Sequence, residues 1–558
     1  MRHGLALIAT SSLWAAVACS DGGTGVTLPP CASSFGSHIG SALGSDTMLD
    51  PASDSGCVVF ANNPSGIDSA IYLVVPQSAT GVPGITASFS LHGDTVRPAL
   101  AAAGAPYTPA LTLAQRFHDF LRQSEQRRWF GSAPAGPGRA AVAPFPAAPD
   151  TVGQQRGFSV CSTLTCSVFT RITATAKAVQ STLVIYVDNA APAGGLSIPD
   201  LDTLAQTFDS RLYAVDTSAF GRESDVDGNG KVIVLMTPLV NKLVTKTQCN
   251  DPGGGFVAGF FFGADIDPVF ATDSRFNHAE VFYSLVADPD SVLSCAHTVS
   301  SIKHVVPVTF VHEFQHMISY NQHVLIKGGD PEVLWLNEGF SHYAEELGGR
   351  SYLPTDSVTF TRFVKGDLYN AYQYLDSTGN HFLLPTAGIG SLAERGAAWL
   401  FVRYLVDQQR ADTSFAAGAA VTRPMEATTL TGATNVANAT GVPFDRTVTN
   451  WALANYVSDL PGFTAPSRLK YSSWAFRAAF ASLHTQYPTN FIKTFPLTPG
   501  VSAGSATSAS GTLRAGSGEY RLVTQLASGP GFTLRFGTSS GGPLPAAAVA
   551  RLTVIKIK

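Results

Sequence analysis

Three residues separate His312 from His316, and Glu313 directly follows the first histidine. Apolar residues recur at helical spacing around this pattern, so we expect a helix of about Val308–Tyr320 that begins at Pro307. A helix brings positions i and i+4 onto one face, and both imidazoles then point the same way. Such a pair suits two ligand positions of one tetrahedral zinc ion, with Glu313 beside them as a general base on bound water.

A catalytic zinc ion needs a third protein ligand and one open position. The best candidate is Glu338, in the segment Trp335-Leu336-Asn337-Glu338-Gly339-Phe340, with 21 residues between it and His316. The stretch from Glu338 to Leu347 is typical of a helix, and a glutamate in its first turn can face the histidine pair. The pattern therefore predicts a zinc-dependent hydrolase, most simply a peptidase.

The histidine motif followed by Trp-Leu-Asn-Glu-Gly-Phe resembles the gluzincin group of metallopeptidases. The sequence is most similar to the hyicolysin-like family of secreted bacterial zinc metallopeptidases, over Val311–Tyr320, Leu334–Glu346 and, more loosely, Tyr186–Asp188 and Asp225–Leu235. The resemblance implies a thermolysin-like zincin domain, a Zn²⁺ cofactor and a protein or peptide substrate. It also implies His312, His316 and Glu338 as ligands, with Glu313 as the base.

Two parts of the gluzincin pattern have no direct counterpart. Thermolysin-like enzymes place an Asp four residues after the third ligand, and here that position is His342. Glu345, one turn further on, is the alternative for orienting the first histidine. Gluzincins also use a downstream Tyr or His to stabilise the oxyanion, and five residues are candidates: Tyr369, Tyr372, Tyr374, His381 and Tyr404.

Asp225, Asp227 and Asn229 alternate before Gly230, as in the first half of a calcium loop. The glutamate expected at the twelfth position is missing, because Met236 stands there. A polar turn before a strand explains the segment equally simply, and we favour it over a Ca²⁺ site.

The N-terminus predicts export. A basic start and a short apolar run suggest a signal peptide over residues 1–18, followed by a tether over 19–30. Small residues before Cys19 resemble a lipobox, which would make Cys19 a lipidation site and the protein a cell-envelope lipoprotein. Cleavage by ordinary signal peptidase, giving a secreted protein, is the alternative.

Six cysteines remain after Cys19, an even number that suggests disulfides in an exported protein. Sequence order suggests Cys31–Cys57, Cys161–Cys166 and Cys249–Cys295, although fifteen pairings can be drawn.

The chain length of 558 residues predicts several domains. We expect an α+β multidomain protein in which a zincin domain (157–500), with a small mixed sheet and a helical subdomain, is flanked by two β modules. The N-terminal module (31–131) includes a helix capped near Thr108 and is followed by an Ala/Pro/Gly linker (132–156). The C-terminal β module covers residues 501–558.

The net charge of −4 gives no reason to expect nucleic acid as a partner. Membrane contact is expected only through the lipid anchor. Two other functions stay open beside a peptidase that cleaves with Glu313. One is a catalytically inactive surface binding lipoprotein, and the other is a zinc aminopeptidase, although no Gly-x-Met-x-Asn segment is present.

Overall fold

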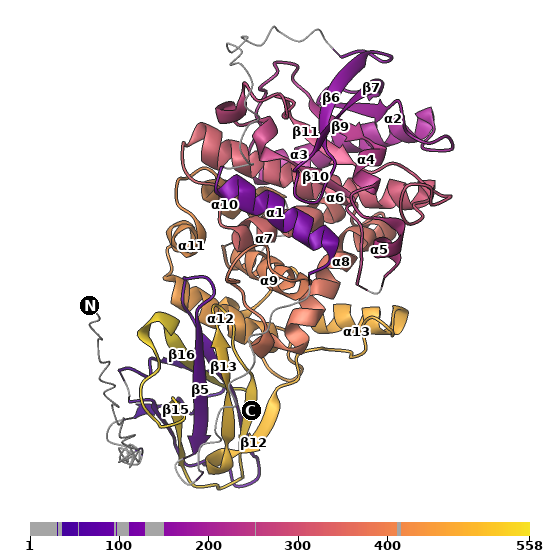
Figure 1. The fold of residues 1–558 in the computed structure, drawn as a ribbon. Helices are drawn as coiled ribbons and strands as arrows, with labels where there is room; N and C mark the ends of the chain where they lie inside the picture. Colours follow the sequence, from indigo (N-terminus) through magenta and orange to yellow (C-terminus); the bar gives the residue numbers. More distant parts are fainter. Residues whose placement is uncertain are drawn as a thin grey trace, which may run out of the picture.

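A computed structural model describes residues 31, 36–53, 55–93, 96, 111–128, 150–251, 253–409 and 415–558. The protein is a mixed α+β molecule of several parts. Figure 1 shows a β-sandwich at one end and, at the other, a twisted sheet with most of the helices. Among the described helices, none is both long and apolar enough to cross a membrane.

The β-sandwich consists of two five-stranded sheets, in the orders β1-β3-β15-β5-β13 and β12-β14-β4-β16-β2. Its N-terminal strands are β1 Ser37–His38, β2 Asp46–Leu49, β3 Cys57–Phe60, β4 Ala70–Ser78 and β5 Thr86–Gly93. Its C-terminal strands are β12 Gly500–Ala503, β13 Ser508–Arg514, β14 Arg521–Gln525, β15 Phe532–Gly537 and β16 Ala550–Lys556. Both sheets therefore mix strands from the two ends of the chain.

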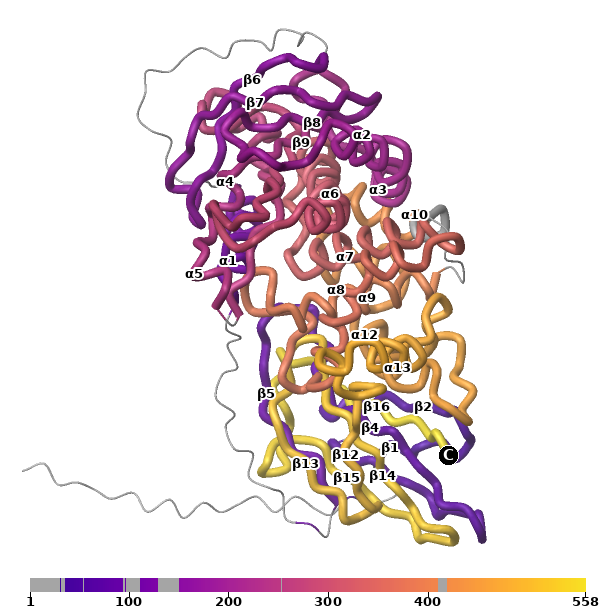
Figure 2. The backbone as a smooth tube through the Cα atoms, turned by 90° about the vertical axis from the view of Figure 1, so that its right-hand side faces the viewer, coloured from indigo at the N-terminus to yellow at the C-terminus, as the bar shows by residue number. Residues whose placement is uncertain are grey.

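This arrangement differs from the expectation of two separate β modules. β4 explains why: Tyr72 and Val74 face the core between the two sheets, while Leu73 and Val75 belong to the larger core shared with the helices. Successive side chains of a strand point to opposite faces, so β4 is buried on both faces, and both of its edges then need hydrogen-bonded partner strands. β14 and β16 supply them, and Figure 2 shows these strands side by side with β4.

The second part is built on a six-stranded sheet in the order β10-β11-β9-β8-β7-β6. Its strands are β6 Gln155–Cys161, β7 Phe169–Val179, β8 Leu183–Asp188, β9 Val232–Met236, β10 Gly259–Phe261 and β11 Val281–Ser284. β8, β9 and β11 run parallel, and the other pairs are antiparallel. β6 begins inside the segment expected as linker, so this sheet starts slightly before residue 157.

Thirteen α-helices lie in the described residues. They are α1 Leu113–Gln126, α2 Ile198–Thr207, α3 Tyr213–Ala219, α4 Pro238–Asn241, α5 Lys246–Asn250, α6 Val299–Tyr320, α7 Leu334–Arg350, α8 Ser357–Asp376, α9 Leu392–Gln409, α10 Phe415–Glu426, α11 Gly432–Thr440, α12 Phe444–Val457 and α13 Phe476–Gln486. α12 contacts the sandwich, where Tyr520 donates to the Ala452 carbonyl at 2.8 Å.

α6 begins nine residues earlier than Val308, where the sequence pattern predicts its start. Thr298 caps the helix by accepting a hydrogen bond from the Ser301 amide. Pro307 lies inside the helix, so it does not mark the first turn. The capping threonine, rather than the proline, sets the start because its side chain satisfies an otherwise unpaired amide.

α1 lies with the helices of the sheet-containing part and not with the N-terminal strands (Figure 1). Phe117 and Leu121 are fully buried there, and Phe117 packs edge-on against Phe260 of β10 at 5.0 Å. Thr112 forms a capping box with Gln115 at its start, whereas the expected cap Thr108 lies outside the described residues. The apolar stripe of this helix therefore joins the sheet-containing part.

Three disulfides link Cys31–Cys57, Cys161–Cys166 and Cys249–Cys295, which confirms the pairing suggested by sequence order. Each closes a loop within one part of the molecule. Disulfides persist in oxidising compartments, so the protein is suited to an extracytoplasmic environment.

Candidate metal centre

α6 is held against the sheet by its aromatic stripe. Phe310 stacks on Phe208 at 4.1 Å and meets Phe282 of β11 at 5.6 Å, and Phe314 stacks on Tyr213 at 5.5 Å. Buried aromatic contacts of this kind fix the rotation of a helix about its axis. His312 and His316 consequently face α7.

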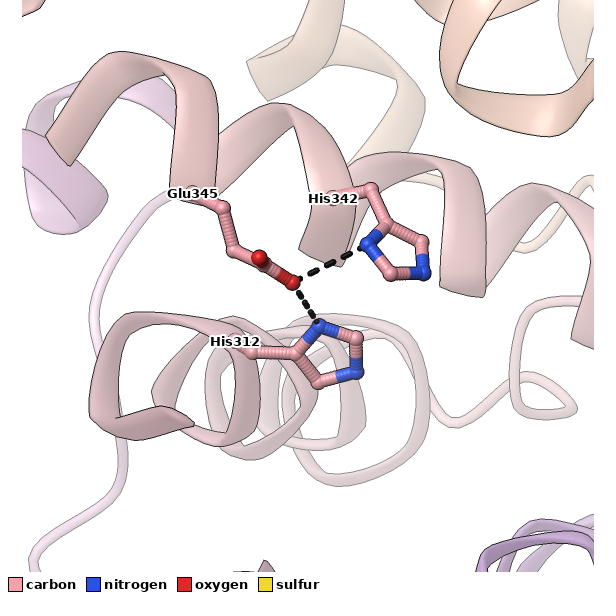
Figure 3. Close-up of side chains that lie close together, drawn as sticks. All are labelled: His312, His342 and Glu345. Atoms are coloured by element: carbon pink, nitrogen blue, oxygen red, sulfur yellow. Dashed lines mark hydrogen bonds and ion pairs between the residues drawn. The ribbon is translucent and has the colours of Figure 1, made fainter. Parts of the chain in front are cut away.

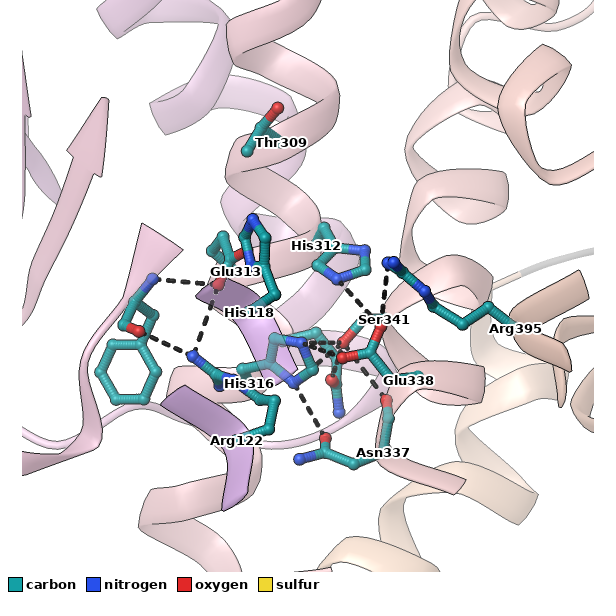
Figure 4. Close-up of polar contacts among 12 residues, drawn as sticks. His118, Arg122, Thr309, His312, Glu313, His316, Asn337, Glu338, Ser341 and Arg395 are labelled. Carbon is teal, nitrogen blue, oxygen red and sulfur yellow. Dashed lines mark hydrogen bonds and ion pairs between the residues drawn. The ribbon is translucent and has the colours of Figure 1, made fainter. Parts of the chain in front are cut away.

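His312 and His316 of α6 meet Glu338 of α7. His312 Nε2 lies 3.7 Å from one Glu338 oxygen, and His316 Nε2 lies 3.5 Å from the other. Ligand atoms of one tetrahedral zinc ion lie about 3.4 Å apart. Figure 4 shows the three side chains converging, and their ligand atoms lie within 4.8 Å of one another. The spacing is that of ligands around a shared ion.

In both histidines, the Nδ1 atom contacts an oxygen of another side chain. His312 Nδ1 lies 2.7 Å from Glu345 Oε1, and His316 Nδ1 lies 3.1 Å from Asn337 Oδ1. These oxygens accept hydrogen bonds, so each Nδ1 carries the proton and each Nε2 keeps a free lone pair. Ser341 also touches the His316 ring, but its hydroxyl donates to Gln315 Oε1 at 2.5 Å.

His312, His342 and Glu345 form a second group of potential metal ligands (Figure 3). Glu345 Oε1 lies 2.7 Å from His312 Nδ1 and 3.0 Å from His342 Nδ1. Direct hydrogen bonds have these lengths, and an ion between the same atoms would need about 3.4 Å. This second group is therefore a cluster held by the His312–Glu345 hydrogen bond and the His342–Glu345 ion pair, beside the first group.

His342 occupies a charged, buried environment. Burial opposes its protonation, but Glu345 and Asp367 outweigh burial and raise the pKa of His342 to about 10. Burial also raises the pKa of Glu345, yet His342 and His312 reverse that effect and lower it to about 2. Burial holds the pKa of Asp367 well above its usual range. Glu345 is consequently ionised and can only accept a hydrogen bond from His312.

Glu313 lies 1% exposed beside the candidate ligands. Its Oε2 accepts a hydrogen bond from the Phe261 amide of β10 at 2.9 Å, and Arg122 Nη2 lies 3.8 Å from the same oxygen. Burial raises the pKa of Glu313 above its ordinary value, while Arg122 opposes the rise. A raised pKa is what a general base needs when it must hold and release a proton.

α1 contributes two residues that the sequence analysis did not identify. His118 Nδ1 lies 3.5 Å from Glu313 Oε1, with 21% of the side chain exposed. Arg122 is buried and donates to the Phe261 carbonyl at 2.7 Å. Burial, followed by the charge of Arg395, holds the pKa of His118 well below its usual range. Its ring is therefore neutral at physiological pH.

The signal for His118 and Arg122 was present but weak. Each follows a residue of the apolar stripe, Phe117 or Leu121, by one position, so all four lie on neighbouring faces of one helix. Nothing in the sequence, however, indicates that α1 packs against residues almost 200 positions away.

Arg395 of α9 lies on the far side of the group, with Nη1 3.6 Å from Glu338 Oε2. Burial raises the pKa of Glu338, but His316 and Arg395 outweigh it and hold the pKa well below the usual range. Glu338 is therefore ionised, which is the state in which a carboxylate can bind a metal ion.

The five downstream oxyanion candidates have other partners. Tyr372, Tyr374 and Tyr404 bond to the Lys493 amide, Ser517 and the Arg468 carbonyl. Tyr369 packs against Phe491, and His381 contacts Ser377. None of these contacts involves Glu313 or Glu338.

The Asp225 loop connects α3 to β9. Asp225 and Asp227 lie within 4.8 Å of a third carboxylate, Glu280, which the sequence analysis did not connect with them. Asn229 Nδ2 donates to Asp227 and to Asp150, both at 3.2 Å. Cys19 lies outside the described residues.

No family model matches the chain. A segment of 146 residues, 26% of this chain, is 28% identical to the Neutral metalloprotease ShpI of Staphylococcus hyicus. The match covers 30% of that relative, so less than a third of its length is represented. Over this segment the chain is similar to a metalloprotease.

Proposed function

We propose that this protein is a zinc-dependent peptidase of the gluzincin type with a thermolysin-like catalytic region. His312, His316 and Glu338 would hold the ion, and Glu313 would act as the general base. The observation that carries the proposal is that the Nε2 atoms of His312 and His316 lie 3.7 and 3.5 Å from the two oxygens of Glu338.

The chemistry of the donor set fits zinc. Two neutral imidazoles and one carboxylate are the ligands of a known class of catalytic zinc site, which leaves one position open. His316 suits this role because burial and Arg122 lower its pKa to about 3, so it stays neutral. Glu338 Oε2 is buried without a hydrogen-bond partner, and a bound metal ion would satisfy this oxygen.

Bound zinc would supply a Lewis acid that polarises a peptide carbonyl and makes water more acidic. Glu313 would accept the proton of the attacking water and pass it to the departing amine. The Phe261 amide fixes one oxygen of Glu313, which leaves the other for proton transfer. Glu345 and Asn337 would keep the two imidazoles oriented throughout.

Negative charge on the carbonyl oxygen requires a hydrogen-bond donor. We propose His118 for this role, because it is neutral, part-exposed and adjacent to Glu313. His118→Phe should lower kcat about 100-fold with little change in KM or bound zinc, the size of effect seen when one such donor is lost. His118→Gln, which keeps a donor, should recover part of the loss. Equal activity in all three proteins would contradict this role.

The decisive experiment compares wild type with Glu313→Gln. Zinc is measured by mass spectrometry and cleavage by a peptide library, with Glu519→Gln as a control that makes the same change on the β-sandwich. Wild type and control should bind one zinc ion and cleave. Glu313→Gln should bind zinc and lose cleavage at least 1,000-fold, roughly 4 kcal/mol of barrier.

Each other result has a clear meaning. Zinc binding without cleavage that depends on Glu313 would favour an inactive binding protein. Cleavage confined to N-terminal residues of the library peptides would favour an aminopeptidase, and internal cleavage sites an endopeptidase.

We propose an exported location, with Cys19 as the lipid anchor. Fatty-acid labelling that persists in Cys19→Ala would contradict the anchor.

A further inference from the structure

Three carboxylates from two segments meet at one edge of the six-stranded sheet. Asp225 and Asp227 belong to the loop before β9, and Glu280 immediately precedes β11. β9 and β11 pair in parallel, so their amino ends share an edge. One carboxylate oxygen from each residue lies within 4.8 Å of the other two. The group therefore combines residues that are more than 50 positions apart.

Glu280, a member of this group, has one buried oxygen without a hydrogen-bond partner among the described residues. The residue is 1% exposed, and its Oε1 accepts hydrogen bonds from the Val226 amide at 2.9 Å and Ser224 Oγ at 2.5 Å. Its Oε2 is buried and has no hydrogen-bond partner among the described residues. An ionised oxygen left unpaired in the interior is costly, so a cation beside Oε2 would stabilise the ionised form of Glu280.

The protein's own cations do not balance the three carboxylates. Arg156 Nη1 pairs with Asp227 at 3.0 Å. Lys231 is close in sequence, but its ammonium donates to the carbonyls of Gln180 and Ser181. Within the described residues one guanidinium thus faces three carboxylates, which leaves negative charge that a divalent cation would match.

We propose that Asp225, Asp227 and Glu280 bind a calcium ion. All donors are oxygens, which suit a hard cation, whereas zinc favours nitrogen and sulfur. Ca²⁺ accepts six to eight oxygen ligands in irregular geometry, so backbone carbonyls and water would complete its shell. Glu280 replaces the glutamate that the loop lacks at its twelfth position. Asn229 instead braces the loop through its hydrogen bonds to Asp227 and Asp150.

A calcium ion here would stabilise a loop that contacts the residues at the end of α6. Asn321 and Gln322, just beyond α6, both donate to the Arg222 carbonyl at the start of the same loop. The ion would fix this loop to β11 through Glu280. The site uses none of the residues of the proposed zinc centre, so it does not depend on the proposed peptidase function.

The test titrates the zinc-loaded full chain, after dialysis against calcium-free buffer, with CaCl₂ in a calorimeter and records the melting temperature. Wild type should bind one Ca²⁺, and its melting temperature should rise by at least about 3 °C at saturation. Glu280→Gln and the exposed Asp225→Asn should each weaken binding at least tenfold. Zinc content should not change in either variant.

Asp216→Asn is the matched control, because Asp216 is a buried acid of α3 outside the group. It should keep the calcium response of wild type. The proposal would be overturned if wild type showed no calcium response, if Asp225→Asn bound Ca²⁺ as wild type does, or if MgCl₂ gave the same stabilisation. Loss of peptidase activity would change neither calcium binding nor the melting temperature. The calcium proposal and the peptidase proposal can therefore be contradicted independently.

Discussion

At the scale of single residues, the candidate centre depends on hydrogen bonds that fix the orientation of each histidine. Glu345 and Asn337 each accept the Nδ1 proton of one ring, and both lie on α7 together with Glu338. One helix therefore carries a candidate ligand and both orienting groups. Any change that rotates α7 should disturb all three at once.

Glu345→Gln should weaken zinc binding about 10- to 100-fold, the usual cost of losing an orienting partner. The amide can still accept a hydrogen bond from His312, but it no longer carries the charge that strengthens it. Competition with a chromophoric chelator measures the affinity. Glu519→Gln provides the control, and equal affinities in the two variants would show that Glu345 does not orient His312.

His342 should make stability depend on alkaline pH. Its pKa is about 10 in the folded protein and near 6.5 when unfolded. Protonation of His342 therefore stabilises the fold fully below about pH 6.5, and this contribution disappears as pH rises through 10. The melting-temperature gap between wild type and His342→Gln should be several degrees at pH 6 and should shrink by pH 10.5. A gap that stayed constant would contradict the ion pairs of His342.

At the scale of elements, close helix packing positions Arg395 and Glu338. Gly396 of α9 lies against the backbone of α8, and a Cβ added there would come within 2.2 Å of the Asn370 carbonyl carbon. Gly339 of α7 similarly approaches Val402 of α9. Arg395 directly precedes Gly396, and Glu338 directly precedes Gly339. Arg395 Nη1 lies 3.6 Å from Glu338 Oε2 because the helices approach so closely at these glycines.

Gly396→Ala should destabilise the protein by about 1–3 kcal/mol or more, since overpacking forces backbone to move. Gly366→Ala on α8 is the matched control, because a Cβ there meets no atom within 4 Å. That control should be neutral or stabilising by about 0.5–1 kcal/mol. Denaturant unfolding measures both, and similar free energies of unfolding for the two variants would contradict the close contact.

The sequence predicted those features that depend on local spacing. The helix around His312 and His316 follows from periodicity, and Glu338 was found because it lies within about 25 residues of them. His118 and Glu280 could not be found in this way, because their partners lie far along the chain. Pairing between remote segments leaves no mark on local periodicity, so the contacts of α1 and of the acidic group appeared only in three dimensions.

At the scale of the whole molecule, the β-sandwich joins the two ends of the chain. β4 lies between β14 and β16, and β5 lies between β15 and β13. On either side, β4 and β5 each pair with a strand from the C-terminal end of the chain. The same pairing brings the sandwich next to α12, so the helices and the sandwich share a continuous core.

A chain that stops before β12 should therefore fail to form a sandwich. β4 and β5 would expose unpaired edges, which promote aggregation. We expect the version ending at residue 499 to lose most of its soluble fraction, as measured by size-exclusion chromatography. Leu526→Ser, at a residue 76% exposed, should remain soluble as control. A soluble monomer with cooperative unfolding would contradict the shared sandwich.

The sandwich also imposes an order of events during synthesis. Lys556 Nζ donates to the Ser41 carbonyl across 515 residues of sequence, beside strands that pair directly. A ribosome needs roughly 25 to 100 s to add that many residues. During this time the early strands have been made but lack their partners. The sandwich can therefore close only after the last fifty or so residues have been added.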